Sequence, residues 1–216
     1  MSMAGMPTKP TSEARERLVN AFLESYAQKP WQKIGVREIV EAAGYARGTF
    51  YRHFSGVDDL LRQVEAENTC TSVCRHIIEL ANVIPLEHAT DAMAAFYEDR
   101  ADTVAVLAAG SNGNNYLDAQ RPPMKAMFAA LLNRGFVMTP LQLDVASEYI
   151  ASAKVGMVRL WLAKRESMTL NQINKMSECF IESDLWNFVA RQAPLHGGPQ
   201  PRKVIDDKPF NYPWLG

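Results

Sequence analysis

The chain has 216 residues, of which 47% are hydrophobic and 22% are charged, and its net charge at pH 7 is -1. These values are typical of a globular protein with one or two compact domains, and any attraction to nucleic acid would have to come from one basic face. No apolar run is long enough to span a membrane, the start lacks the apolar core of a signal peptide, and three cysteines argue against a disulfide framework, so we expect a cytoplasmic protein.

Residues 1–10 are polar with Gly and Pro, and we expect a flexible arm there. The next stretch predicts a helix from about Ser12 to Gln28. Its apolar residues recur at helical spacing and form one stripe: Leu18, Val19, Phe22, Leu23 and Tyr26. We expect this helix to brace the segment that follows rather than to contact a ligand itself.

Two short helices joined by a glycine are predicted next. The apolar positions Val36, Ile39, Val40 and Ala43 follow helical spacing, and Gly44 stands where a helix ends in a left-handed turn. A second helix from about Ala46 to Phe54 would bury Phe50 and Phe54. It would leave other faces to polar and basic residues: Arg47, Thr49, Tyr51, Arg52 and His53. This pattern indicates a helix-turn-helix.

The stretch from about Leu18 to Leu61 resembles the N-terminal DNA-binding domain of the TetR family of transcriptional regulators. The sequence Arg-x-Thr-Phe-Tyr-x-His-Phe, starting at Arg47, is similar to that of a subgroup that includes the DhaS-type regulators. Two positions depart from the family pattern. Gly35 stands where the family usually has a Thr that caps the first helix of the motif, and a glycine can still cap a helix. Val57 stands where the family often has a phosphate-binding Lys.

The DNA-binding residues follow from the motif and from the resemblance. Ala46 opens the second helix, and Arg47 behind it can donate two hydrogen bonds to a guanine, with Thr49 giving a weaker contact. The resemblance implies that Tyr51 and His53 hold phosphates and that Arg37 lies near the DNA backbone. Arg52 is either solvated or phosphate-facing, and Tyr51 can alternatively pack against the first helix.

The rest of the chain is predicted to be helical. Ser55, with Asp58 as its partner, is expected to cap a long connecting helix that continues past Ala81. Pro85 marks a break, residues 86–109 form one kinked helix or two, and residues 108–115 form a loop. Further helices are expected from Pro122 to about Arg134, over about 140–165 and over about 169–191.

The helix at 140–165 is apolar nearly all round, which predicts burial on more than one side: Val145, Ala146, Tyr149, Ile150, Ala153, Gly156, Met157, Leu160 and Trp161. The expected architecture is all-α. It comprises an arm at 1–10, a DNA-binding domain at 11–56, a sensing and dimerisation domain at 57–191, and a Pro- and Gly-rich tail at 192–216.

The sequence shows no pattern of catalytic or metal-binding residues. It has no Gly-rich phosphate loop and no Gly-x-Ser-x-Gly, and its four histidines lack metal-ligand spacing. Cys70 and Cys74, four residues apart, are interpreted as two small semi-buried residues, because a metal site would need further ligands. We therefore expect no enzyme, no cofactor and no metal.

One recognition helix covers too little DNA for useful specificity, so we expect a homodimer on a palindromic operator. The last two long helices, over about 140–165 and about 169–191, are expected to supply the dimer interface, and the residues expected in it are Ile173, Met176, Phe180 and Phe188. The resemblance implies a repressor that is released by a small apolar or aromatic effector. Candidate ligand residues, each of which is more often ordinary core than part of a ligand site, are Met93, Tyr97, Met127, Phe128, Met157 and Trp161.

Two alternatives remain from the sequence. One is a TetR-fold regulator controlled by a protein partner, which predicts a filled core and a sizeable exposed apolar patch. The other is an enzyme with a DNA-binding-like head, which predicts a polar cleft with perturbed ionisable groups.

Overall fold

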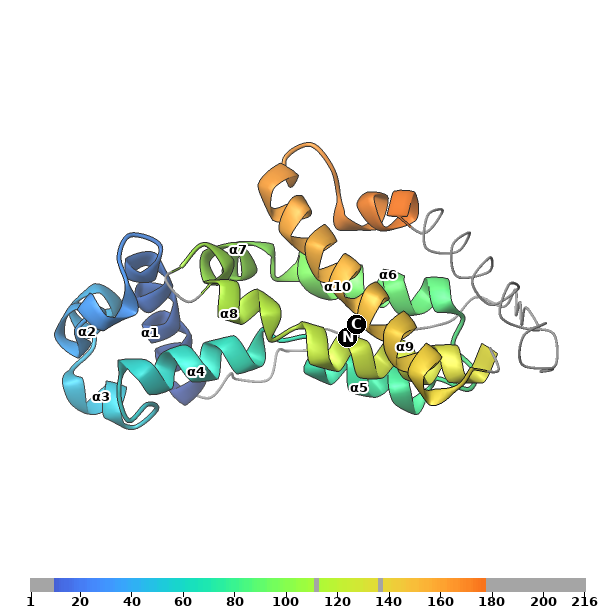
Figure 1. Ribbon diagram of the computed structural model, residues 1–216. Coiled ribbons are helices and arrows are strands. Elements are labelled where there is room, and N and C mark those ends of the chain that lie inside the picture. Colours follow the sequence, from blue (N-terminus) through green and yellow to red (C-terminus); the bar gives the residue numbers. More distant parts are fainter. Residues whose placement is uncertain (1–9, 111–112, 136–137, 178–216) are drawn as a thin grey trace, which may run out of the picture. The chain divides into compact units, whose positions relative to one another are not determined.

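The structure, a computed structural model, describes residues 10–110, 113–135 and 138–177, and every regular element within them is a helix (Figure 1). The all-α fold is thus confirmed. Within the same residues, no helix is long and apolar enough to cross a membrane. The elements are α1 (Pro10–Tyr26), η1 (Trp31–Lys33), α2 (Val36–Ala43), α3 (Arg47–Tyr51), α4 (Val57–Glu67), α5 (Thr71–Glu79), α6 (Leu86–Asp99), α7 (Ala101–Ala109), α8 (Gly113–Asp118), α9 (Arg121–Gly135), α10 (Pro140–Lys164) and a further helical segment at 170–177.

The chain divides into two compact units. Of the described residues, the first unit contains 10–68 and those of the segment 102–116, and the second contains 69–101, 117–135 and 138–177. The first unit contains the expected domain at 11–56 together with α4 and the segment 102–116; α4 contacts η1, and Gly110 of the segment lies against Tyr26 of α1.

The core of the first unit is built from the apolar stripes that the sequence predicts. Leu18, Phe22 and Tyr26 of α1 are buried, and the rings of Phe22 and Tyr26 stack with centroids 5.4 Å apart. α1 packs against both α2 and α3, so it braces the motif as expected. Phe50 and Phe54 are also fully buried, with ring centroids 5.4 Å apart.

The turn between α2 and α3 depends on Gly44. Its φ of 75° lies in the left-handed region, where a glycine carries no steric penalty, and it is the C-cap of α2. The amide of Tyr45 then donates to the carbonyl oxygen of Val40 at 2.9 Å, which closes the helix end. The predicted helix-turn-helix is present, although α3 spans only Arg47–Tyr51 and is shorter than the expected 46–54.

The expected connecting helix from Ser55 past Ala81 is wrong in two respects. Gly56, not Ser55, is the N-cap of α4, while the backbone amide of Ser55 donates to Oδ2 of Asp59 at 2.8 Å. The helix also ends at Glu67. There the side chain of Asn68 donates to the carbonyl oxygen of Val64, and such local side-chain bonds compete with continued helix. A separate helix, α5, follows.

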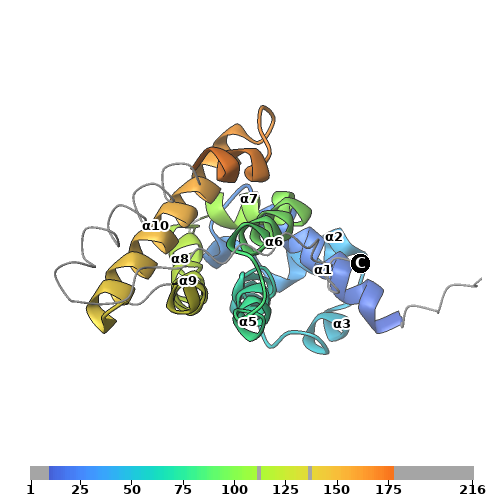
Figure 2. The ribbon, with the colours of Figure 1, turned by 90° about the vertical axis from the view of Figure 1, so that its right-hand side faces the viewer.

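The middle of the chain forms two helices, α6 and α7, which are separated at Arg100. Residues 86–109 are therefore two helices and not one kinked helix, the two alternatives that the sequence left open. The expected loop at 108–115 is partly helical, because α8 begins at Gly113. In the second unit, α9 packs against both α5 and α10, and α9 and α10 lie side by side in both views (Figure 1, Figure 2). Thr139 caps α10 and forms a capping box with Gln142.

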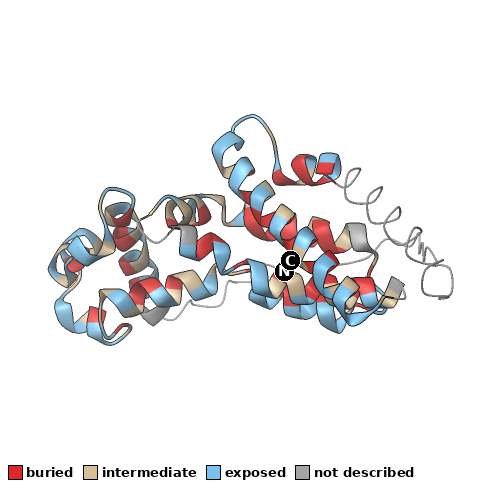
Figure 3. Cartoon of the chain, in the orientation of Figure 1, coloured by how far each residue is buried: buried red, intermediate tan, exposed pale blue. Residues whose placement is uncertain are grey.

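The apolar sequence of helix α10 predicts burial on more than one side, and this prediction is wrong. One face, which includes Ile150, Val158 and Trp161, is buried in the second unit. The other face is exposed to solvent and carries four large apolar side chains: Leu141 (73% exposed), Val145 (55%), Tyr149 (58%) and Leu160 (48%). The burial colours of α10 show both faces (Figure 3). The described neighbours of α10 thus cover it from one side.

Candidate nucleic-acid interface and regulatory cavity

Helix α3 is attached to the first unit by one apolar side and exposes the rest. Phe50 is buried, whereas Arg47, Tyr51 and Arg52 are exposed, and α3 is largely drawn in the exposed colour (Figure 3). Positions 47, 48, 51 and 52 share a face on a helix, opposite residue 50. The fold therefore displays a basic and aromatic face on a rigidly held helix.

Arg47 lies in the first turn of α3, immediately after the exposed N-cap residue Ala46. Among the described residues its guanidinium makes neither a hydrogen bond nor an ion pair, so all of its donors face solvent. Arg52 differs, because its Nη2 donates to Oγ1 of Thr49 at 3.1 Å. Thr49 is half-buried and Tyr51 is 58% exposed, so Tyr51 is not packed away against α1.

The two acidic residues of α2 are each held by a cation. Nε of Arg37 lies 2.6 Å from Oε1 of Glu41, and this hydrogen bond raises the pKa of the arginine. Glu38 accepts from Lys29 at 2.8 Å and from Ser25, and the hydrogen bond from Lys29 lowers its pKa. The negative charge of each carboxylate is thus balanced by its own cation, and it does not by itself offset the positive charge of α3. The Arg37–Glu41 pair is highly exposed, so it contributes little to stability and can exchange for a phosphate.

His53 follows α3 and is half-buried. Burial lowers the pKa of its imidazole, and the positive charges of Arg52 and Arg15 lower it further. The ring is therefore neutral near pH 7 in the DNA-free protein. A phosphate close to the ring would favour the charged form and oppose these effects.

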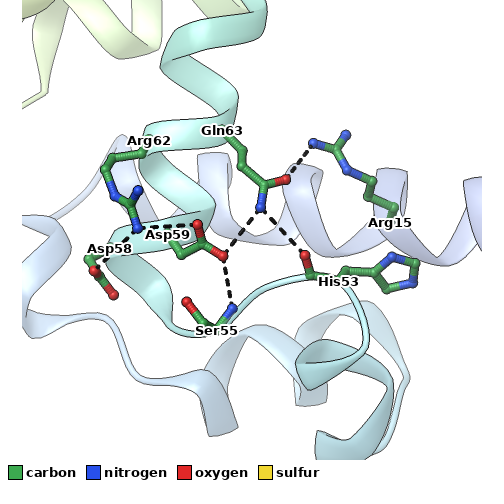
Figure 4. Close-up of polar contacts among 7 residues, drawn as sticks. All are labelled: Arg15, His53, Ser55, Asp58, Asp59, Arg62 and Gln63. Atoms are coloured by element: carbon green, nitrogen blue, oxygen red, sulfur yellow. Dashed lines mark hydrogen bonds and ion pairs between the residues drawn. The ribbon is translucent and has the colours of Figure 1, made fainter.

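A polar network, drawn in Figure 4, fixes the turn between α3 and α4. Oδ2 of Asp59 accepts from the Ser55 amide and from Nε2 of Gln63, and the bond from Ser55 lowers the pKa of Asp59. Gln63 also contacts the His53 carbonyl at 3.5 Å, and Arg15 of α1 donates to its Oε1 at 3.3 Å. The sequence analysis did not identify Gln63 or Arg15, because their pairing spans most of the first unit.

A small cavity of about 20 Å³ lies within the second unit, which is room for roughly one water molecule. Of the six candidate ligand residues, Met93, Tyr97, Met127 and Phe128 line it. Trp161 is buried elsewhere in the core and Met157 is half-buried, and neither lines the cavity. The remaining lining residues are Thr90, Ala94, Met124, Lys154, Val158, Leu170 and Asn174.

Lys154 was not identified from the sequence. It is only 7% exposed, and its Nζ donates to Oδ1 of Asn174 at 3.2 Å and to Oγ of Ser177 at 3.3 Å. The signal in the sequence was a lysine inside an otherwise apolar helical stretch. A charged side chain is rarely buried to this degree without a specific arrangement of polar partners.

The expected dimer residues have different environments. Ile173 is 5% exposed, so its own subunit already buries it, whereas Met176 is 60% exposed. Phe180 and Phe188 lie outside the described residues. The exposed apolar face of α10, defined here by Leu141, Val145, Tyr149 and Leu160, lies on the first of the two long helices that were expected to supply the dimer interface.

Cys70 and Cys74 are both buried; Sγ of Cys70 donates to the carbonyl oxygen of Gln120 at 3.5 Å, and Sγ of Cys74 lies 3.8 Å from Sδ of Met93. The neighbouring Cys70 and burial raise the pKa of the Cys74 thiol, so it is an unreactive thiol at neutral pH. No cluster of three or more His, Cys, Asp or Glu side chains that could hold a metal ion occurs in the part of the chain that the structure describes.

Comparison with known sequences agrees with the geometry of the first unit. A family model for bacterial regulatory proteins of the tetR family matches residues 18–64. An uncharacterised HTH-type transcriptional regulator of Haemophilus influenzae is 39% identical over 59 residues, which cover 27% of this chain and 29% of that protein. The match thus spans less than a third of the relative and is confined to one domain.

Comparison with solved structures extends the likeness to both units. NalD, the secondary repressor of the MexAB-OprM multidrug efflux pump in Pseudomonas aeruginosa, superposes with a TM-score of 0.63 at 15% identity, covering 82% of this chain and 97% of NalD. The dihydroxyacetone kinase operon activator DhaS gives a TM-score of 0.54 at 13% identity, covering 79% and 95%. At these identities the likeness shows the fold alone.

Proposed function

We propose that the chain, which belongs to the tetR family of bacterial regulatory proteins, is a repressor that binds a palindromic operator as a homodimer and is released by a small effector. The observation that carries the proposal is the presentation of Arg47. It stands in the first turn of an exposed helix whose apolar side is locked into the core through Phe50. A helix of this kind fits the major groove, where an arginine can donate to O6 and N7 of guanine.

The other expected DNA contacts support the same orientation. Tyr51 and Arg52 are exposed on α3, and His53 and Arg37 flank it at the following turn and on α2. In our proposal Tyr51, His53 and Arg37 bind phosphates, with Arg37 exchanging Glu41 for a phosphate oxygen. These contacts position the helix, and Arg47 supplies the base specificity.

Dimerisation is proposed because one short helix reads too few bases. Two recognition helices about 34–36 Å apart would contact successive major grooves of one operator. The exposed apolar face of α10, together with Met176, offers the kind of surface that a second copy would cover. We place the interface there rather than at Ile173, which is already buried.

The effector is proposed to bind at the cavity in the second unit, whose apolar wall and three methionines suit an adaptable site. A ligand changes operator affinity only if it binds the two conformations with different affinities. The small volume of the cavity also favours a second candidate, a regulator with the same DNA-binding function that is controlled by a protein partner. NalD is named a repressor and DhaS an activator, so likeness of fold is compatible with either direction of control.

The test begins with selection of bound duplexes from a randomised DNA pool. We expect an inverted repeat to be enriched, and light scattering to show two chains on each duplex. A reporter carrying the selected site should be transcribed less when the protein is present. Failure to enrich any sequence over scrambled DNA would refute the proposal, and a rise in transcription would make the protein an activator.

The two candidate signals are separated in the same reporter. Small apolar and aromatic molecules are screened for release of the operator. If none releases DNA, the protein-partner candidate replaces the small-molecule one, and the DNA-binding conclusion is unaffected.

A further inference from the structure

We propose that Cys70, Cys74 and Met93 of the second unit form a binding site for a soft monovalent metal ion such as Cu(I). Such a site would be a further function of the chain, beside the proposed binding of operator and effector. In the sequence the two cysteines lack a third ligand. The fold supplies one, because α5, at whose start the cysteines lie, packs against α6, which carries Met93.

The three sulfur atoms come from one turn of α5 and from the facing side of α6. Cys70 is the N-cap of α5, and the amide of Cys74 donates to its carbonyl oxygen at 2.8 Å, so the two thiols lie one helical turn apart on the same side of the helix. The neighbouring Cys70 is also the largest cause of the raised pKa of the Cys74 thiol. Sδ of Met93 lies 3.8 Å from Sγ of Cys74. Two thiols and one thioether thus meet between two helices.

The distance between the sulfur atoms of Cys74 and Met93 suits a shared metal ion. Two sulfur atoms that are each about 2.3 Å from one ion are about 3.8–4.0 Å apart when the ion has three or four ligands. The measured separation of 3.8 Å already has this value. Both side chains can therefore hold one ion without a shift of either helix.

The surroundings of the sulfur atoms exclude water and fix the position of Cys70. All three residues are buried, with exposed fractions of 0% for Cys70, 1% for Cys74 and 6% for Met93. The amide of Cys70 donates to Oε1 of Gln120 at 2.9 Å, which holds its backbone, whereas its thiol makes only a long bond of 3.5 Å to the carbonyl oxygen of Gln120. A thiol is a weak donor, so a metal ion can replace its proton at little cost in hydrogen bonding.

The charge of the bound state favours a monovalent ion at this position. A metal ion displaces the proton of a coordinating thiol, even one that is otherwise unreactive, and both thiol protons pass to solvent. Two thiolates and one monovalent cation leave a net charge of -1. Cys70 stands at the N-terminus of α5, a helix of nine residues, where the helix dipole stabilises a negative charge. The thioether of Met93 adds a ligand and no further charge.

The set of ligands selects a soft ion. Among the described residues, no third His, Cys, Asp or Glu joins the two cysteines, so the four ligands of a usual zinc site and the oxygen ligands of calcium or magnesium are lacking. Thiolate and thioether ligands select Cu(I). Met93 also lines the cavity of about 20 Å³, which gives its flexible side chain room to turn the thioether toward the ion.

The experiment loads the full-length chain with Cu(I) under nitrogen, with ascorbate to keep the copper reduced. Competition with the coloured Cu(I) chelator bicinchoninate gives the affinity and the number of ions bound, and X-ray absorption gives the ligand atoms. We expect one Cu(I) per chain and only sulfur ligands, at about 2.3 Å, the length of a metal–thiolate bond. Ag(I) should displace the copper, whereas an excess of Zn(II) should not.

The variants assign the site to its residues. Cys74→Ser and Met93→Leu should each weaken Cu(I) binding by at least about tenfold to a hundredfold, because loss of a partner outside the ligand shell already costs that much. Met93→Leu nearly conserves volume, so its fold, checked by circular dichroism, should be kept. The control is Cys179→Ser, at the third cysteine of the sequence, which lies outside the described residues and should leave Cu(I) binding unchanged.

The proposal is overturned if the chain retains no Cu(I) in competition with the chelator, or if X-ray absorption shows nitrogen or oxygen ligands. Equal affinity in the wild-type chain and in Met93→Leu would remove the thioether from the site, and a loss in Cys179→Ser would place the site elsewhere. Displacement of copper by Zn(II) would contradict the class of ion. Should Cys74→Ser fail to fold, Met93→Leu and the X-ray absorption of the wild-type chain decide.

Discussion

The backbone of Gly110 lies directly against the aromatic ring of Tyr26, and a Cβ added to Gly110 would overlap Cε1 and Cζ of that ring. Tyr26 ends α1, and Gly110 follows α7, so two segments far apart in the sequence meet inside the first unit. The absence of a side chain at position 110 permits this approach. The segment 102–116 is thereby part of the unit that carries the recognition helix.

We predict that Gly110→Ala destabilises the protein by about 1–3 kcal/mol, the usual cost of overpacking a filled site, because neither the backbone nor the ring can move freely. Urea denaturation followed by circular dichroism measures the change. A loss below about 0.5 kcal/mol, the range of an ordinary surface substitution, would mean that Gly110 and Tyr26 do not pack in this way.

Gly48→Ala is the matched substitution, because a Cβ at position 48 meets no atom within 4 Å. Its φ is not in the left-handed region, so we expect stability to be unchanged or to rise by about 0.5–1 kcal/mol, the gain of Ala over Gly in a helix. Operator affinity should nevertheless fall, since the new methyl group stands on the face of α3 that would approach DNA. Unchanged affinity in a mobility-shift titration would place DNA on another face.

Arg47→Ala is predicted to weaken operator binding by about 1–3 kcal/mol, the range for one bidentate base contact. Binding to scrambled DNA should fall less, because the lost contact carries sequence information. Both duplexes are titrated at one salt concentration. The control is Arg17→Ala, at an α1 arginine paired with Glu13. Equal losses of binding free energy on the operator and on scrambled DNA would mean that Arg47 contacts a phosphate and not a base.

Operator affinity is predicted to rise as the pH falls from about 7.5 to about 6, through His53. The pKa of free His53 is lowered by burial and by Arg52 and Arg15, whereas a bound phosphate would raise it. The complex then binds more protons than the free protein, and lower pH favours the complex. The expected gain is lost in His53→Gln, measured by fluorescence anisotropy at constant ionic strength.

The same pKa shift affects stability in the opposite sense. The fold keeps the pKa of His53 below its ordinary value of 6.5. Below that pH the unfolded chain therefore binds more protons than the folded protein, and the contribution of His53 to stability falls.

For operator affinity, a dependence on pH that persists in His53→Gln would assign that effect to a group other than His53.

Val145→Glu is predicted to convert the proposed dimer to a monomer, because it introduces a charge into the exposed apolar face of α10. Light scattering gives the molecular mass, and operator affinity should fall because the two recognition helices are no longer linked. Val83→Glu is the control, since Val83 is 56% exposed against 55% for Val145 but does not lie on α10. A Val145→Glu protein that remains a dimer would move the interface elsewhere.

Local spacing alone determined the helix-turn-helix. The apolar positions of α1 and α2, the left-handed turn at Gly44 and the exposure of Arg47 and Arg52 all follow from helical periodicity and from the steric freedom of glycine. These are interactions between residues a few positions apart, and one sequence suffices to predict them.

Tertiary packing decided which faces of the later helices are covered. Helix α10 is apolar nearly all round, so periodicity could not show that Trp161 lies in the core away from the cavity while Val145 faces solvent. The placement of Lys154 beside Asn174, and of Gly110 against Tyr26, likewise depends on segments that meet only in the folded chain. The composition of a helix states how much apolar surface it has, but the neighbours that cover that surface come from distant parts of the sequence.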